Sequence, residues 1–138
     1  MTTVPETSIF TKIIQGEISG FIPYQTDTIT VLIALEGHIL IVPKQQYKDI
    51  FELPDEIAAE IMQTAVKVSK ALKTTTNCEG VNLIQSNGAV AGQEVFHFHL
   101  HIKPRFKDDG VIFKWDTSTV SEATRQELSN AIKNQLIK

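Results

Sequence analysis

The sequence predicts an α+β fold in which helices pack on a mostly antiparallel sheet. Segments rich in β-branched residues follow one another with short links, which is typical of antiparallel strands. Two other segments repeat apolar residues every three or four positions, as amphipathic helices do. A chain of 138 residues is long enough to bury one core, so we expect a single domain over residues 1–138.

The first part of the chain predicts a short helix followed by two strands. Apolar residues recur within residues 9–14 and Gly16 follows them, which is typical of a short amphipathic helix with a glycine stop. Residues 23–33 and 38–44 are rich in β-branched residues and predict two strands joined by a short link. Pro43 should end the second strand, because proline has no N–H for further pairing.

From Pro54 onward the hydrophobic period changes to that of a helix. Proline suits a first helical turn, and the two acidic residues after it face the positive end of the helix dipole. Apolar residues then recur at helical spacing as far as about Lys73, so we expect one long helix. A strand, a glycine-containing loop and another strand follow, over residues 81–86, 87–93 and 94–104.

The C-terminal segment predicts a further amphipathic helix. Within residues 118–138, Leu128, Ile132 and Leu136 lie on one stripe of a helix. Residues 111–116, which contain the only tryptophan, lead into it.

The composition is that of an ordinary globular protein and excludes several kinds of partner. A net charge of −3 and a pI near 5.8 give no electrostatic reason to bind nucleic acid or an anionic membrane surface. Cys78 is the only cysteine, so no intrachain disulfide can form. We see no apolar core of a signal peptide near the N-terminus and no apolar run long enough to cross a bilayer. We therefore expect a cytoplasmic protein without nucleic-acid or membrane partners.

Three of the four histidines alternate with apolar residues, at His97, His99 and His101. In a strand, successive side chains point to opposite faces, so the three imidazoles would share one face. The residues between them would then enter the core from the other face. This arrangement predicts a row of imidazoles on a supported surface.

Three interpretations of this row compete. It could be a polar strand face without function, or a metal site for which Glu94 is the only local candidate as a further ligand. The third interpretation is nucleophilic and acid–base chemistry on phosphorus, since imidazole is largely unprotonated near neutral pH. The preceding loop favours this third interpretation. Its glycine N–H groups and the side chains of Ser86, Asn87 and Gln93 can donate to an anion.

Four segments resemble signatures of the histidine-triad (HIT) superfamily, in the family's order. His97 to Lys103 resembles His-φ-His-φ-His-φ-φ, where φ is apolar. The segments "SIFTKIIQGEI", "GHILIVPK" and "NGAVAGQEVFHFHLHIKPR" are similar to three further family segments. The resemblance covers about residues 8–106 and leaves 107–138 as a C-terminal extension. It implies a homodimer and a five-stranded antiparallel sheet. Together with the helices predicted above, the expected fold is therefore this sheet with a short N-terminal, a long central and a C-terminal helix.

The resemblance also implies a function. Members of the superfamily bind nucleotides, and many hydrolyse nucleoside phosphoramidates, aminoacyl adenylates or dinucleoside polyphosphates through a nucleotidyl-histidine. His99 matches the nucleophile, and His101 matches the residue that contacts the phosphate or assists the leaving group. His97 and His38 match residues that orient and support the site. The base would lie against Ile9, Phe10 and Ile13, and the phosphate among Ser86, Asn87, Gly92, Gln93, Glu94 and Val95.

Several positions depart from the family pattern. Ser8 and Thr11 replace two cysteines of zinc-binding relatives and Gln46 replaces a histidine, so we expect no structural zinc and no cofactor. The segment 25–36 lacks the aspartate that holds the ribose in many members. Within that segment, Glu36 is a candidate substitute and Asp27 is expected in a turn before the strand. Glu94 replaces a serine or threonine, and Lys103 replaces an apolar residue and is expected to face solvent.

We expect a metal-independent hydrolase, with phosphoramidase-like chemistry, that acts on a purine nucleotide or nucleotide conjugate. The main alternative is a nucleotide-binding module with little catalysis, which the altered ribose segment favours. A nucleotidyl transferase would use the same covalent intermediate with another acceptor. A metal-dependent enzyme would lose its activity on chelation. Read without the resemblance, the three apolar residues near the N-terminus would belong to the core and His38 to a strand edge.

Overall fold

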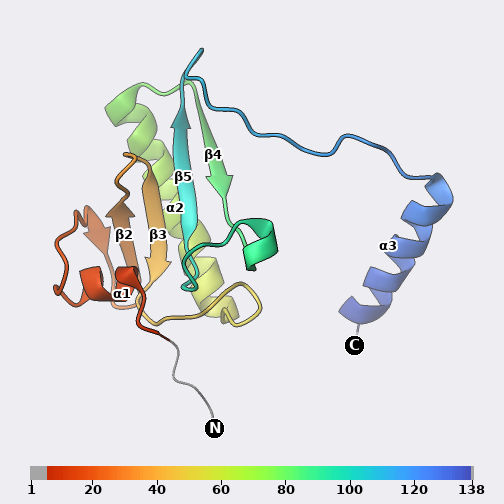
Figure 1. Cartoon of the computed structure of the whole chain (residues 1–138), viewed down its shortest axis with the longest axis horizontal. Coiled ribbons are helices and arrows are strands. Elements are labelled where there is room, and N and C mark those ends of the chain that lie inside the picture. The colour runs from red at the N-terminus through yellow and green to blue at the C-terminus, as the bar shows by residue number, and fades with distance from the viewer. Residues whose placement is uncertain (1–5, 138) are drawn as a thin grey trace, which may run out of the picture.

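A five-stranded antiparallel sheet forms the centre of the computed structural model, which describes residues 6–137. Its spatial order is β1-β2-β3-β5-β4 (Figure 1). The strands are β1 Tyr24–Gln25, β2 Ile29–Ile33, β3 Ile39–Pro43, β4 Gly80–Ile84 and β5 Leu100–Arg105. The predicted α+β class with five antiparallel strands is confirmed.

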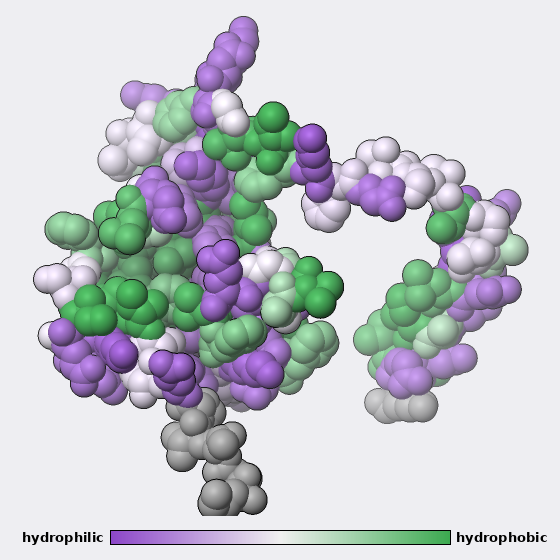
Figure 2. Space-filling view, viewed as in Figure 1, coloured by the Kyte–Doolittle hydropathy of each residue, from purple (hydrophilic) through white to green (hydrophobic). Residues whose placement is uncertain are grey.

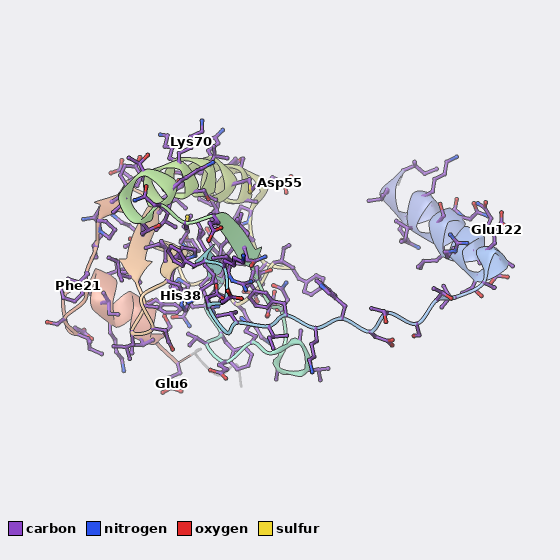
Figure 3. All side chains as sticks on the ribbon, turned by 90° about the horizontal axis from the view of Figure 1, so that it is seen from above. Glu6, Phe21, His38, Asp55, Lys70 and Glu122 are labelled. Atoms are coloured by element: carbon purple, nitrogen blue, oxygen red, sulfur yellow. The ribbon has the colours of Figure 1, made fainter. Side chains whose placement is uncertain are left out.

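Helices lie on both faces of the sheet. Helix α1 (Ile9–Ile14) covers one face and helix α2 (Asp55–Thr76) covers the other, as Figure 3 shows from above. Helix α3 (Glu122–Leu136) lies apart from this body, beyond strand β4 (Figure 1). All three predicted helices are present, and α2 runs three residues past its expected end at Lys73.

Side chains of the sheet alternate between two apolar clusters, as the period of two in a strand requires. The cluster on the α2 side contains Ile29, Val31, Ile39, Ile41, Ile61, Ala65, Phe98 and Ile102. The cluster on the α1 side contains Phe10, Leu32, Leu40 and Val42. The apolar stripe of α2 therefore covers the first cluster, and α1 closes the second.

The segment 23–33, predicted as one strand, contains the two strands β1 and β2 instead. The N–H of Thr26 donates to the carbonyl of Ile29 at 2.8 Å and closes a turn, in which Asp27 lies as expected. The hydroxyls of Thr26 and Thr28 donate to the carboxylate of Glu60 in α2. Threonine is β-branched and therefore resembled strand sequence, whereas here it anchors a turn to a helix.

Strand β5 begins at Leu100, so the strand predicted over residues 94–104 is wrong in its first half. Ile41 pairs with Leu100, and the same register would place Pro43 opposite Phe98. Proline has no N–H, so the pairing ends there. The N–H of Phe98 donates instead to the carbonyl of Tyr47 at 2.6 Å. The alternation of faces nevertheless continues, since Phe98 still packs in the cluster on the α2 side.

Strand β4 covers residues 80–84 where 81–86 was predicted. No helix within residues 6–137 has the length and apolar character needed to cross a membrane. The single domain over residues 1–138 and the cytoplasmic location stay predictions.

Candidate active site

Four histidines from three parts of the chain meet on the α1 side of the sheet. His101 belongs to β5, His38 precedes β3, and His97 and His99 lie in the segment that enters β5. The ring centroids of His99 and His101 are 4.8 Å apart, and Nε2 of His38 lies 2.8 Å from Nδ1 of His101. The structure thus brings together all four histidines that the sequence analysis selected.

His97 is fully buried and has both ring nitrogens hydrogen-bonded. Its Nε2 lies 2.7 Å from the carbonyl oxygen of Pro43, and a carbonyl only accepts, so Nε2 carries the proton. Its Nδ1 therefore accepts from the hydroxyl of Ser8, at 2.6 Å. A ring with no free nitrogen cannot attack a substrate, which leaves His97 a supporting position.

The three positions that depart from the zinc-binding relatives form a hydrogen-bonded group, and two of them contact this ring. Besides Ser8, Thr11 places its hydroxyl 3.4 Å from Nδ1 of His97 and 3.3 Å from Oε1 of Gln46. The backbone N–H of Ser8 also donates to Oε1 of Gln46, at 2.9 Å. One imidazole with neutral hydroxyl and amide oxygens is a poor donor set for zinc, which prefers thiolate, imidazole and carboxylate. A hydrogen-bond network links these three positions to His97.

His99 has a defined tautomer. Its Nδ1 lies 2.7 Å from the carbonyl oxygen of His97, so Nδ1 donates and Nε2 carries a lone pair. The Phe10 and His99 rings pack in a T-shaped arrangement, with centroids 4.9 Å apart and ring planes at 62°. Burial lowers the pKa of His99, although the bond to the His97 carbonyl opposes this effect. The ring is therefore neutral at physiological pH and keeps its lone pair.

His101 and His38 form a neutral pair. Burial, followed by the charges of His99 and His38, lowers the pKa of His101 to about 4. Burial also lowers the pKa of His38, against the opposing charge of Glu36. Both rings are neutral at pH 7, so one of the two facing nitrogens carries a hydrogen and donates it to the other.

His38 and His101 line an open cavity of about 410 Å³. Ser86 and Gly92, both predicted for the phosphate, lie on its wall. Gly92 has φ +98°, a conformation that favours glycine and that turns the loop toward the cavity. The other lining residues, most of which the sequence analysis did not select, are Glu36, Ile84, Lys103, Val111 and Phe113.

Lys103 is half-buried and lines this open cavity, so solvent reaches it there as expected. It stands two residues after His101 in β5 and therefore projects from the same face. That spacing was visible in the sequence and is the signal that could have placed it.

Arg105 fixes the start of the C-terminal segment beside this cavity. Its guanidinium donates to the carboxylate of Asp109 at 2.8 and 3.0 Å and to Asn82 at 2.8 Å. It also donates to the carbonyl of Val111 at 2.8 Å and lies 5.3 Å from the ring centroid of Phe113. Residues of the C-terminal extension thereby form part of the cavity wall.

Other predicted residues build the loop or lie elsewhere. The amide of Gln93 is buried and bonds to backbone groups of Lys48, Gly88 and Val95. Asn87 accepts from the N–H of Ile50 at 2.7 Å. Ile13 packs beside the α1-side cluster. A separate hollow of about 330 Å³ is lined in part by Ile9, Glu94 and Val95. Within the expected base pocket, Phe10 packs its ring on His97 and His99.

The sequence pattern of the HIT domain matches residues 15–108. This chain belongs to the HIT family. "Protein hit" of Bacillus subtilis is 32% identical over 95% of each chain. Adenosine 5'-monophosphoramidase HNT1 of Saccharomyces cerevisiae is 36% identical over 82% of this chain and 72% of its own length. A crystal structure of a HIT family member from B. subtilis has a TM-score of 0.87 at 31% identity, over 94% of this chain and 96% of its own.

The lowered pKa values of these histidines predict a pH-dependent stability. Below pH 6.5 the histidines take up protons in the unfolded chain but stay neutral in the folded protein. The free energy of unfolding should therefore fall as the pH drops from about 6.5 toward about 4. Urea unfolding followed by circular dichroism measures this fall. We expect a smaller fall in His101→Gln. An identical pH dependence in that variant and in the wild type would contradict the assigned pKa.

Proposed function

We propose that this HIT protein hydrolyses a nucleotide conjugate, with a nucleoside phosphoramidate as the simplest substrate, through a nucleotidyl intermediate on His99. The tautomer of His99 carries the proposal, because the bond to the His97 carbonyl leaves Nε2 free to attack. A relative whose name states adenosine 5'-monophosphoramidase activity supports the choice of substrate.

In the first step, Nε2 of His99 attacks the α-phosphorus and the bond from phosphorus to the leaving nitrogen breaks. The departing amine takes up a proton. The anionic phosphate raises the pKa of His101, so that the ring can take up a proton. His101 then assists this step by donating that proton to the amine. In the second step, water attacks the phosphorus and gives a proton to His101, which lost its own in the first step; the bond to His99 breaks, and a nucleoside monophosphate leaves. Two steps with lower barriers replace one difficult displacement.

The phosphate would lie in the cavity of His38 and His101, where Ser86 and the backbone of Gly92 can donate to its oxygens. Phe10 would contact the nucleoside from the α1 side, next to His99. The aspartate that holds the ribose in many family members is absent from this chain. Glu36 is the carboxylate that lines this cavity and would contact the ribose in its place. Weak ribose binding with little turnover would correspond to a binding module instead.

Replacement of the nucleophile tests the mechanism. We expect His99→Ala to lower kcat for adenosine phosphoramidate by at least about a thousandfold while the circular dichroism spectrum is unchanged. Intact-mass spectrometry of acid-quenched wild-type protein should detect a nucleotidyl adduct on His99. An active His99→Ala protein would exclude the mechanism. A wild-type protein that binds adenosine monophosphate without turning over any conjugate would favour the binding module.

Lys103 points to a second feature of the substrate. Its side chain lines the same cavity as His101, and no carboxylate within residues 6–137 lies within ion-pair distance of it. A cation in the cavity of His101, the residue proposed to assist the leaving group, favours a leaving group that carries negative charge, such as a further phosphate. We therefore propose that conjugates with an anionic leaving group bind better than those with a neutral amine.

We expect Lys103→Met to lower kcat/KM for a dinucleoside polyphosphate by about 10- to 100-fold, the value of one charge-assisted hydrogen bond. The change for a phosphoramidate with an uncharged amine should stay below about threefold. Lys70→Met, on the exposed surface of α2, is the matched control and should change neither value. Equal losses for both substrates would show that Lys103 does not select the leaving group.

A further inference from the structure

Helix α3 has an apolar face that packs against nothing in the described chain. None of its residues is buried, and Leu128 and Ile132 are 60% and 49% exposed. These two residues and Leu136 follow one another at intervals of four, so they form one stripe. Figure 2 shows the apolar side chains of α3 gathered on the side toward the body, across an open gap. A helix of 15 residues is marginal in water, so this stripe needs a surface to cover it.

The chain holds α3 away from its own body. Residues 107–121 contain no helix or strand and carry α3 past the β4 edge of the sheet (Figure 1). In Figure 3, α3 lies to one side of the body, level with α2 and the sheet and not with α1. The start of this connection is fixed, because Arg105 binds Asp109 and the carbonyl of Val111. The direction in which α3 leaves is thus built into the fold.

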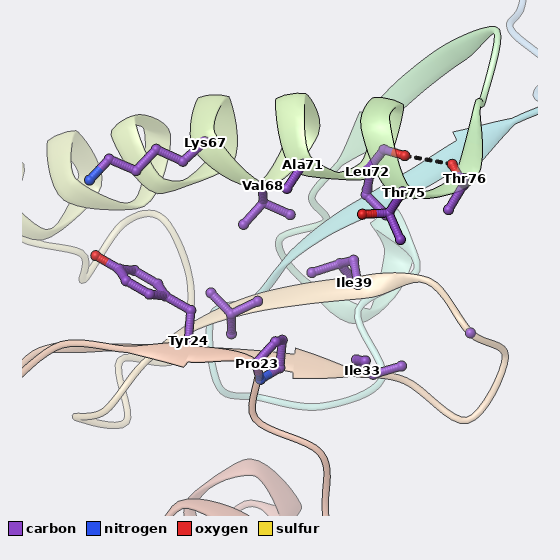
Figure 4. Close-up of a pocket in the computed structure, with 12 residues that line it drawn as sticks. Pro23, Tyr24, Ile33, Ile39, Lys67, Val68, Ala71, Leu72, Thr75 and Thr76 are labelled. Carbon is purple, nitrogen blue, oxygen red and sulfur yellow. Dashed lines mark hydrogen bonds between the residues drawn. The ribbon is translucent and has the colours of Figure 1, made fainter.

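An apolar groove of about 510 Å³ lies at the opposite edge of the sheet, between α2 and strands β1 to β3. Figure 4 shows Tyr24, Ile33 and Ile39 facing Val68, Ala71 and Leu72 across open space. Tyr24 and Ile33 are both 42% exposed. The groove is therefore an uncovered apolar surface within the described part of the chain.

The groove and the stripe have matching lengths. The α2 wall of the groove runs from Lys67 to Thr76, nine residue steps of a helix or about 13 Å. The stripe from Leu128 to Leu136 covers eight steps, or about 12 Å. A helix laid along α2 would thus place its whole stripe in the groove.

We propose that α3 is an exchanged arm, which docks into this groove of a second copy of the chain. The groove of the same copy lies at the β1–β2 edge, whereas α3 lies beyond β4 at the other edge. In such a pair, a two-fold axis runs perpendicular to the sheet and passes beside β4 of the first copy. The second copy then lies beyond β4, with its β1–β2 edge on the far side, where α3 of the first copy would reach it. Both α2 helices then stay on the same side of the sheets, and each copy gives one arm and receives one.

The alignment with the B. subtilis structure includes part of the segment that forms α3. Its match covers 94% of the 138 residues, so about 8 residues are unmatched, fewer than the 15 of α3. The aligned region therefore extends into α3.

Cysteine cross-linking between copies tests the proposal. Ala71→Cys places a thiol in the groove, and Ala131→Cys places one beside the stripe of α3. The two single variants are mixed, left to exchange subunits and oxidised mildly. We expect a covalent two-chain species in the mixture and not in either variant alone. Asn130→Cys, on the opposite face of α3, is the matched control and should give at least about tenfold less product.

Three results would overturn the proposal. No cross-link in the mixture, or equal cross-linking by Asn130→Cys, would show that the groove does not receive α3 of another copy. If a double variant that carries both cysteines forms only an internal cross-link, α3 docks within its own chain. Absence of specific cross-linking would leave the groove to another occupant, such as an apolar small molecule, whereas an internal cross-link would show that α3 fills the groove of its own chain. Cys78 is buried, and wild-type protein treated identically shows whether it contributes.

Hydrogen exchange gives a second readout that needs no new thiol. We expect amide protection of α3 to rise with protein concentration and to fall at least about tenfold in Leu128→Asp. Asn130→Asp should keep the wild-type protection. Protection of α3 that does not depend on concentration would contradict docking between copies. These experiments measure assembly and not turnover, so their outcome is independent of the proposed hydrolysis.

Discussion

The hydrogen bond from Nδ1 of His99 to the carbonyl oxygen of His97 decides which nitrogen of His99 keeps a lone pair. The bond is available because residues 97–99 are outside the β ladder. Pro43 ends β3 and cannot donate to a partner, so pairing with β5 stops before the histidines. The carbonyl of Pro43 then binds His97, and the carbonyl of His97 binds His99. Pro43 thus ends the strand pairing before His99, and the irregular backbone there lets the His97 carbonyl fix the tautomer of His99.

Two peripheral segments hold this arrangement in place. Helix α1 has six residues and is too short to be stable alone. Ser8 caps it by accepting from the N–H of Thr11 at 3.1 Å and binds His97 with the same hydroxyl, while Phe10 packs on His97 and His99. On the other side, Arg105 ties the C-terminal extension to the cavity wall. The site and these segments therefore stabilise one another.

Much of the fold and the choice of histidines could be predicted from local patterns. The alternation at residues 97–102 separates the imidazoles from the core residues even where the regular strand is missing, because an extended backbone keeps the period of two. Asp27 was expected in a turn, but the threonines around it resemble strand sequence, so the short β1 was not predicted as a separate strand. Asn87 and Gln93 were expected to face a phosphate. They bind backbone groups instead, because an irregular loop must satisfy its own N–H and C=O groups. Such partners depend on segments far apart in sequence, which no local pattern contains.

The tautomer of His99 can be measured directly by two-dimensional 15N–1H NMR of the imidazole nitrogens near pH 7, with His99→Gln used to assign the signals. The account predicts a neutral ring with a protonated Nδ1 and an unprotonated Nε2. A proton on Nε2, or a doubly protonated ring at that pH, would contradict it, because no lone pair would then remain to attack phosphorus.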